Sequence, residues 1–179
     1  MVLPTITTTV EVTDDHRTAA IENADISHTD NDRNRSHTNK QISALVGVLG
    51  EMLAEEAIEK TDDFDLEESP DPKYDGILNG NKIEIKTRKT WNYSKPDLLV
   101  RKKFDLASDF YIQIDLYTKN NEDIEMDLSN VTHGKIVGFV DDEDVEKYGE
   151  PFLPGKKNDT DKVPRHRLRP MHELHALIC

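Results

Sequence analysis

The sequence predicts a single α/β domain built around a mixed β-sheet, and three patterns lead to this class. Apolar residues recur at helical spacing over residues 42–58. Two strand-like runs, 74–78 and 82–86, meet at an Asn-Gly pair at residues 79–80, which is the strongest short-range signal for a hairpin. A further strand pattern, rich in β-branched and aromatic residues, covers residues 110–116. Helical and strand patterns share one chain, so we expect helices that flank a mixed sheet.

The N-terminal residues 1–37 are predicted to form a poorly ordered or accessory segment. They are rich in Thr, Asp, Asn and His and show little periodicity beyond a possible short strand at residues 7–12. We therefore place the folded domain at residues 38–179, with a core at 38–117 and a C-terminal extension at 118–179.

A long amphipathic helix is predicted to begin near Thr38. Gly47 and Gly50 lie within its apolar stripe, where they lower helix propensity but permit close approach to a neighbouring element. Glu51 follows beside the stripe, either as part of a charged helix face or as a carboxylate directed over the seam between helix and sheet. The stripe consists of Ile42, Leu45, Val46, Leu49, Met52, Leu53 and Ile58.

The remaining elements are assigned from shorter patterns. An acidic extended segment at residues 63–66 leads into the rigid turn of Pro70, Asp71 and Pro72. The hairpin occupies residues 73–87. The later elements are a helix at 96–106, a strand at 110–116, a polar connection at 117–130, a strand at 135–140, a helix at 141–148, a loop at 151–161, a short strand at 163–168 and a helical turn at 171–178.

Composition narrows the functional classes. The chain has 179 residues, of which 35% are hydrophobic and 33% charged, and its net charge is -13. No run of about 18 apolar residues is present, so we expect no membrane span. The start of the sequence lacks the basic and apolar regions of a signal peptide, and the single cysteine, Cys179, permits no internal disulfide. We therefore expect an acidic, cytoplasmic protein.

The acidity opposes a nucleic-acid partner, because phosphates would be repelled. It has two explanations, namely salt adaptation or a partner of another kind. The charge balance reverses, however, over residues 86–103, where Asp97 is the single acid. Basic residues alternate there with aromatic ones, which suits base stacking and backbone contact. The candidate substrate-binding residues are Arg88, Lys89, Trp91, Tyr93, Lys95, Arg101, Lys102 and Lys103.

The hairpin predicts a cluster of charges. With a two-residue turn, Leu78 pairs with Asn81, and the register then places Asp75 opposite Glu84. Glu84 and Lys86 share one face, since side chains alternate along a strand. Opposed residues have Cβ atoms about 4.5–5.5 Å apart, and like charges at that spacing destabilise a sheet. The two carboxylates therefore call for a cation, and a divalent metal fits best.

Hard oxygen ligands favour Mg²⁺ or Mn²⁺. Such an ion activates water and stabilises charge on a phosphorane-like transition state. Lys86 can neutralise developing charge or position the attacking water. Two acids, a lysine and a basic-aromatic flank therefore indicate metal-dependent phosphodiester hydrolysis.

At these residues the chain resembles the PD-(D/E)XK nuclease superfamily. Glu84-Ile85-Lys86 matches the (D/E)XK element, Asp75 matches the upstream acid, and the segment from Gly47 to Glu51 is similar to the glutamate-bearing first core helix of many members. The resemblance implies a restriction-endonuclease-like core of order αβββαβ, a mixed central sheet flanked by helices. It also implies that Asp75, Glu84, the main-chain carbonyl of Ile85 and Glu51 bind the metal, while Asp75, Glu84 and Lys86 form the catalytic set.

Several alternatives stay open. Asp71 follows a proline, as the superfamily motif prescribes, and competes with Asp75 for the role of first acid. A three-residue turn would place Asp75 opposite Ile85, and Lys86 could be a surface partner of Asp75 or Glu84. No phosphate-binding loop or dinucleotide fingerprint is present, so we expect no nucleotide cofactor.

The sequence as a whole favours a magnesium-dependent DNA endonuclease of viral, mobile-element, restriction or junction-resolving type. We expect a homodimer if both strands are cut. The alternatives are a non-catalytic nucleic-acid-binding or assembly protein that retains the fold, and a salt-adapted interaction domain.

Overall fold

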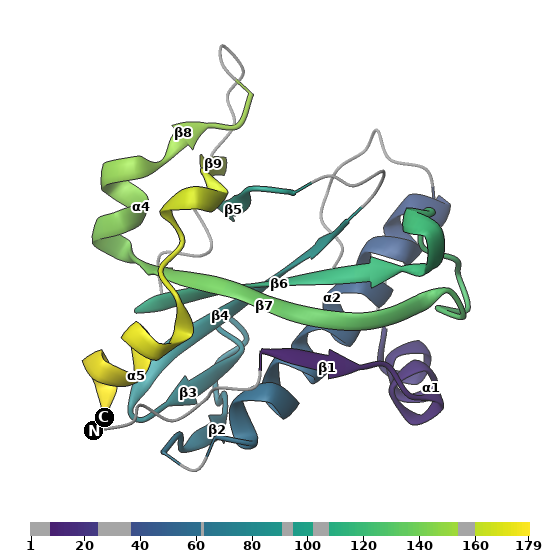
Figure 1. Cartoon of the computed structure of the whole chain (residues 1–179), viewed down its shortest axis with the longest axis horizontal. Helices are drawn as coiled ribbons and strands as arrows, with labels where there is room; N and C mark the ends of the chain where they lie inside the picture. Colours follow the sequence, from purple (N-terminus) through teal and green to yellow (C-terminus); the bar gives the residue numbers. More distant parts are fainter. Residues whose placement is uncertain (1–7, 25–36, 62, 91–94, 102–107, 154–159) are drawn as a thin grey trace.

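The computed structural model describes residues 8–24, 37–61, 63–90, 95–101, 108–153 and 160–179 (Figure 1). Its elements are, in chain order, β1 (Thr9–Glu11), α1 (Asp14–Asn23), α2 (His37–Glu59), β2 (Leu66–Glu68), β3 (Gly76–Leu78), β4 (Asn81–Lys89), β5 (Leu98–Arg101), β6 (Phe110–Thr118), β7 (Val131–Asp141), α4 (Asp142–Tyr148), β8 (Glu150–Pro151), β9 (Thr160–Val163) and α5 (Met171–Ile178), with short 3-10 helices at Lys119–Asn121 and Arg165–Arg167.

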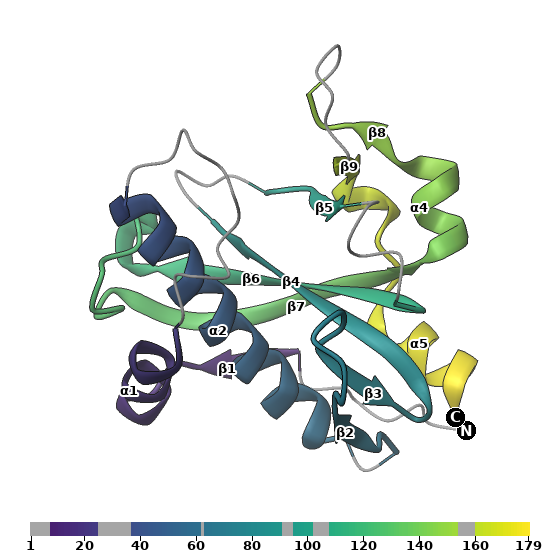
Figure 2. The same ribbon diagram turned by 180° about the vertical axis from the view of Figure 1, so that it is seen from behind.

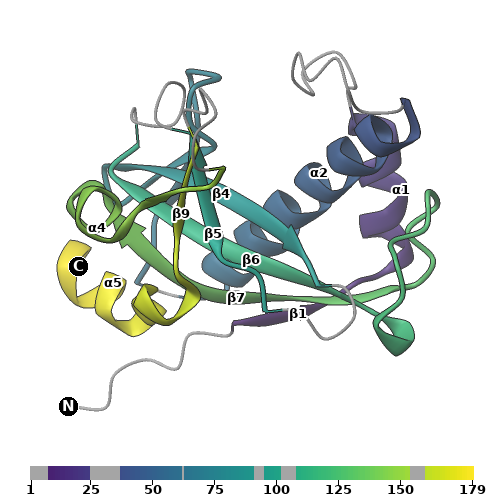
Figure 3. The same cartoon turned by 90° about the horizontal axis from the view of Figure 1, so that it is seen from above.

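The main sheet has six strands in the order β1-β7-β6-β4-β3-β2. β4 and β6 are parallel, and the other neighbours are antiparallel. The predicted mixed α/β sheet is thereby confirmed. A second sheet of three strands, in the order β5-β9-β8, lies beside it. Figure 3 shows α1 and α2 towards one end of the molecule and α4 and α5 towards the other.

The main core lies between α2 and the six-stranded sheet. α2 crosses the face formed by β4, β6 and β7 (Figure 2). Leu49 and Leu53 of α2 are completely buried, as are Ile83 of β4 and Ile114 of β6. Each such side chain contributes about 1.5–3 kcal/mol through burial. The long helix that the apolar stripe predicts is therefore held in place by hydrophobic packing on the sheet.

The Asn-Gly turn has the predicted geometry. Asn79 and Gly80 both have positive φ, at 47° and 81°, as a tight two-residue hairpin turn requires. Leu78 pairs with Asn81, and the registered pairs end at Gly76 and Ile83. β3 is thus a strand of 3 residues beside a β4 of 9 residues. Beyond Ile83, the edge of β4 on this side extends past the end of β3.

The N-terminal segment is more ordered than its composition predicts. β1 adds to the exposed edge of β7, within the short strand predicted at residues 7–12. α1 begins at a capping box, in which the Thr13 side chain accepts a hydrogen bond from the amide of His16. The His16 ring lies 2.7 Å from Glu56 of α2, and Arg17 donates to two backbone carbonyls. These contacts with distant residues order a segment that lacks a periodic pattern of its own.

The helix predicted at residues 96–106 is wrong at its centre, where β5 forms a strand. Leu98 and Val100 are buried with the alternation of a strand, and β5 pairs with β9. Residues 102–107 lie outside the described structure. Leu98 and Leu99 fit a helical stripe as well as a strand, and pairing with a strand sixty residues later decides between them. β5 packs over Tyr111 and Val140, forming a second, smaller core.

The C-terminal extension completes the main sheet. β7 includes the strand predicted at residues 135–140 and pairs with β6 along its length. α4 follows its predicted position and is capped by Asp141, whose carboxylate accepts from the amide of Asp144. The strand predicted at 163–168 is wrong beyond Val163, because a 3-10 helix occupies Arg165–Arg167. In the described part of the chain, no helix has the length and apolar character needed to cross a membrane.

The two glycines of α2 give a matched test of the packing. A Cβ added at Gly50 would lie 2.6 Å from the Cβ of Thr87 on β4, whereas one added at Gly47 meets nothing within 4 Å. We expect Gly50→Ala to lower the free energy of unfolding by about 1–3 kcal/mol through overpacking. Gly47→Ala should raise it by up to about 1 kcal/mol through helix propensity. Urea unfolding measures both, and equal stability of the two variants would contradict this packing.

Candidate active site

Asp75 caps the edge of β4 where β3 ends. Its backbone amide donates to the carbonyl of Ile83, and its carboxylate accepts a hydrogen bond of 2.6 Å from the amide of Ile85. Asp75 therefore lies beside Glu84, the residue between these two partners. The predicted neighbourhood of Asp75 and Glu84 is present, although the registered pairs of the ladder stop one residue earlier, at Gly76.

The backbone of Ile85 faces the same edge. Its amide points to Asp75, and in an extended strand the N–H and C=O of one residue point to the same side. The carbonyl of Ile85 is therefore directed towards the end of β3. An acid and a main-chain oxygen are thus brought together at one point, as the sequence predicts for Asp75 and Ile85.

Glu84 and Lys86 form an ion pair on the face of β4 opposite Ile83 and Ile85. The Lys86 Nζ lies 2.6 Å from Glu84 Oε1, and the side chains of Lys86 and Glu84 are 22% and 13% exposed. An ion pair with so little exposure is shielded from solvent and salt more than a surface pair is. Lys86 is thus held next to the carboxylate of Glu84, with which the sequence predicts that it shares a face of the strand.

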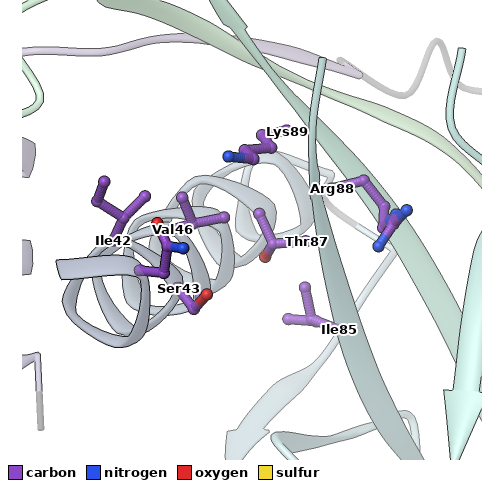
Figure 4. A pocket seen from close by; sticks show the side chains of 9 residues that line it. Ile42, Ser43, Val46, Ile85, Thr87, Arg88 and Lys89 are labelled. Atoms are coloured by element: carbon purple, nitrogen blue, oxygen red, sulfur yellow. The ribbon is translucent and has the colours of Figure 1, made fainter. Parts of the chain in front are cut away.

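Glu51 is the acid that α2 contributes. Burial, followed by the nearby carboxylates of Asp75, Glu55 and Glu84, raises the pKa of Glu51 to about 8, whereas Lys86 acts in the opposite direction. Burial and the neighbouring acids Glu59, Asp75 and Glu68 also raise the pKa of Glu55. Glu51 therefore lies close enough to Asp75 and Glu84 for their charges to act on it, although the side chains of Glu84 and Lys86 project from the face of β4 that is turned away from α2, opposite to Ile85 (Figure 4).

The donor set fits a hard divalent cation in its chemistry. Carboxylate and carbonyl oxygens are the ligands of Mg²⁺ and Mn²⁺, and a cation would offset both the burial and the neighbouring carboxylates that raise the pKa of Glu51. Within the described residues, no three His, Cys, Asp or Glu side chains cluster closely enough to hold an ion as they stand. Side-chain movement, above all release of Glu84 by Lys86, would be needed to bind one.

Asp71, the rival first acid, lies in the turn before β3. Its carboxylate accepts a hydrogen bond from the amide of Lys73, and its carbonyl accepts from the Ser69 hydroxyl. Asp75, by contrast, bonds directly to the backbone of β4. The geometry favours Asp75 for the site.

The predicted substrate-binding residues are divided between several places. Lys89 is exposed at the end of β4 and lies 3.2 Å from Asp123, while Lys95 and Arg101 are exposed near β5. Arg88 is partly buried, and burial lowers the pKa of its guanidinium despite the nearby Asp115 and Asp97. Arg88 therefore lies within the electrostatic influence of Asp115 and Asp97, on the side of β4 turned away from α2 (Figure 4). Trp91, Tyr93, Lys102 and Lys103 lie outside the described residues.

A buried polar network beside Lys86 was not predicted from the sequence. Gln113 of β6 is in register with Lys86 and donates to Asp115 and to the carbonyl of Pro96. Asp115 is completely buried and pairs with Arg165 from the C-terminal extension. Burial raises the pKa of Asp115, while Arg165 and Gln113 oppose this shift. The available signal was two polar residues at alternate positions of an otherwise apolar strand.

Two polar atoms of this network make no hydrogen bond with any residue that the structure describes. They are Gln113 Oε1 and Arg88 Nε, and both are inaccessible to solvent. Such atoms carry a desolvation penalty unless a further partner reaches them. The polar layer next to Lys86 is therefore one place where the interior retains unused hydrogen-bonding capacity.

Two clefts meet at Ile85. The larger, of about 460 Å³, lies between the first half of α2 and the far half of β4 and is lined by Asn39, Ile42, Ser43, Val46, Gly47, Ile85, Thr87, Arg88 and Lys89. Figure 4 shows Ile85 and Thr87 pointing from β4 towards α2, while Arg88 points to the other side of the strand. The smaller, of about 270 Å³, is lined by Glu55, Glu59, Leu66, Glu67, Glu68, Asp75, Gly76, Ile83 and Ile85.

Comparisons of the chain with protein-family models, curated proteins and solved structures find no match.

The raised pKa of Glu51 predicts a pH dependence of stability. In the metal-free protein, folded Glu51 keeps its proton up to about pH 8, whereas the unfolded chain releases it near 4.5. The unfolded state thus binds fewer protons between these values, so this contribution to stability is complete below pH 4.5 and is lost as the pH rises to about 8. Urea unfolding at several pH values should show a smaller loss for Glu51→Gln than for the native chain. Glu59→Gln, an exposed change on the same helix, is the control, and an unchanged pH profile of Glu51→Gln would contradict the assignment.

The buried network predicts a large difference between two carboxylates. Asp115→Ala leaves Arg88 and Arg165 without their buried partner, and we expect a loss of about 3 kcal/mol or more in the free energy of unfolding. Asp123→Ala removes only the exposed partner of Lys89 and should change it by less than about 1 kcal/mol. Chemical denaturation compares them, and a mild effect of Asp115→Ala would show that the network is not important for stability.

Proposed function

We propose that the protein is a metal-dependent nuclease that hydrolyses DNA phosphodiester bonds. The observation that carries the proposal is the edge of β4 beyond β3. There the carboxylate of Asp75 is hydrogen-bonded to the backbone of Ile85, next to the Glu84–Lys86 pair, and Glu51 of α2 lies within the electrostatic influence of Asp75 and Glu84. These are the residue types that metal-assisted phosphodiester hydrolysis needs in one place.

The order of the elements supports a restriction-endonuclease-like core of the PD-(D/E)XK type. α2 precedes the antiparallel strands β2, β3 and β4, and β6 then adds in parallel to β4. This is the order expected from the resemblance, except that β5 stands where the crossover helix was predicted. Under this proposal Asp75, Glu84 and Lys86 would correspond to the acids and the lysine of that superfamily.

Each residue then has a definite role. Asp75, Glu84, Glu51 and the Ile85 carbonyl would hold Mg²⁺ or Mn²⁺, which activates water and neutralises charge on the phosphate when bound. Glu51 must give up its proton before it can serve as a ligand, because only the carboxylate binds a hard cation. Lys86 must leave Glu84, after which its ammonium can orient the attacking water or stabilise negative charge on the phosphate.

The proposal extends to partners. Lys89, Lys95 and Arg101 are exposed cations that would contact phosphate, and a chain of net charge -13 needs such local contacts to bind DNA. Cutting of both strands would require two copies of the site, so we propose a homodimer for that case. We further propose action in the cytoplasm, in keeping with a single cysteine.

One observation favours a second function. Lys86 neutralises Glu84 in the structure, and such a pair could simply stabilise the sheet of a non-catalytic nucleic-acid-binding or assembly protein. This alternative predicts DNA binding without turnover under any divalent ion.

The decisive test is cleavage of supercoiled and branched DNA with Mg²⁺, Mn²⁺ or EDTA at low and high salt. We expect metal-dependent cutting that falls at least about a hundredfold in Glu84→Gln and in Lys86→Met, because each removes a charge at the reacting phosphate. Glu143→Gln and Lys147→Met, both exposed on α4, are the matched controls. Cutting that survives both site substitutions, or no cutting by the native chain, would refute the nuclease.

A further inference from the structure

We propose that an unpaired DNA strand lies in the cleft between α2 and β4, so that the substrate has a single-stranded segment next to the bond that is cut. This inference rests on the proposed function and adds a substrate class to it. The cleft begins at Ile85, whose amide is bonded to Asp75, and therefore adjoins the candidate active site at Asp75, on the side of β4 that faces α2 (Figure 4).

The two clefts that meet at Ile85 differ in charge, and only one of them can accept the phosphates of a DNA strand without repulsion. The smaller cleft is lined by Glu55, Glu59, Glu67, Glu68 and Asp75, and these carboxylates repel phosphate. The larger cleft ends at Lys89, and the described residues that line it include no acid. A strand whose scissile phosphate lies at Ile85 is therefore directed along β4 towards Lys89.

The lining of the larger cleft suits a nucleic-acid strand. Asn39, Ser43 and Thr87 carry polar groups, while Ile42 and Val46 provide apolar surface for bases or sugars. α2 has no acid in its first turn, so the positive end of the helix dipole reinforces this polarity. Both side chains of the Lys89–Asp123 pair are exposed, and in such a weak surface pair a phosphate can readily replace Asp123 as the partner of Lys89.

The size of the cleft selects for a single strand. A volume of about 460 Å³ is that of a small-molecule site and admits a short stretch of one strand. A double helix, with two backbones on either side of its stacked base pairs, is far larger than this cleft. Gly47 lines this space, and a Cβ added there would meet no atom of the described residues within 4 Å.

Gly47→Leu adds a side chain at the lining of the cleft, where the Cβ has room, and leucine also favours helix. Ala176→Leu adds similar bulk at an exposed position of α5 and is the matched control. Fluorescence anisotropy with a short labelled single-stranded oligonucleotide, with Ca²⁺ in place of Mg²⁺, measures binding separately from cleavage. Thermal unfolding verifies that both variants are folded.

We expect the native chain to bind the single strand more tightly than a blunt duplex of the same length. Gly47→Leu should weaken this binding about tenfold or more, and Ala176→Leu should leave it unchanged. Equal binding by Gly47→Leu and the native chain, or preference for the blunt duplex, would overturn the inference. Binding that depends on Gly47 but is never followed by cutting would instead refute the nuclease and retain the strand-binding cleft.

Discussion

The hydrogen bond between the Ile85 amide and the Asp75 carboxylate is the contact on which the candidate site depends. β3 ends at Gly76, while β4 continues to Lys89, so the backbone of β4 beyond Ile83 needs another partner on that side. Asp75 supplies one with its side chain and is thereby fixed beside Glu84. Because β3 is shorter than β4, the edge of β4 beyond β3 is free to receive the Asp75 carboxylate. This carboxylate and the main-chain carbonyl of Ile85 therefore lie close together there.

The rest of the fold holds the edge of β4 in position and surrounds it with charged side chains. β6 holds β4 from the other side through parallel pairing, and the close contact of Gly50 with Thr87 brings α2 near enough for Glu51 to face Asp75. Burial, together with the nearby carboxylates, makes the charged form of Glu51 unfavourable and raises its pKa. Lys86, which pairs with Glu84, offsets part of this effect. Binding of a cation would replace this internal compensation.

Local signals in the sequence were sufficient for the elements that build the site. The Asn-Gly pair determined the turn and the pairing of Leu78 with Asn81, and the apolar stripe located α2 and placed Glu51 at its edge. Both depend on residues close together in the chain. The proximity of Glu51, Asp75 and Glu84 could be predicted because one hairpin and the helix that precedes it contain all three residues.

Features that depend on distant partners could not be predicted in this way. β5 is a strand because β9 pairs with it, and α1 is ordered by Glu56, Leu128 and Val131. The Gln113–Asp115–Arg165 network joins a strand to the C-terminal extension, and neither segment alone indicates the other. Alternation of polar residues within the apolar run of β6 was the available sign that something buried lay opposite them.

The most direct test of the central claim is the position of a bound ion. A crystal structure of the native chain with Mn²⁺, analysed by anomalous scattering, locates the metal independently of activity. We expect one Mn²⁺ at the edge of β4, bound by Asp75, Glu84 and the carbonyl of Ile85, with Lys86 displaced from Glu84. Manganese bound only elsewhere, with the Glu84–Lys86 pair intact, would contradict the account.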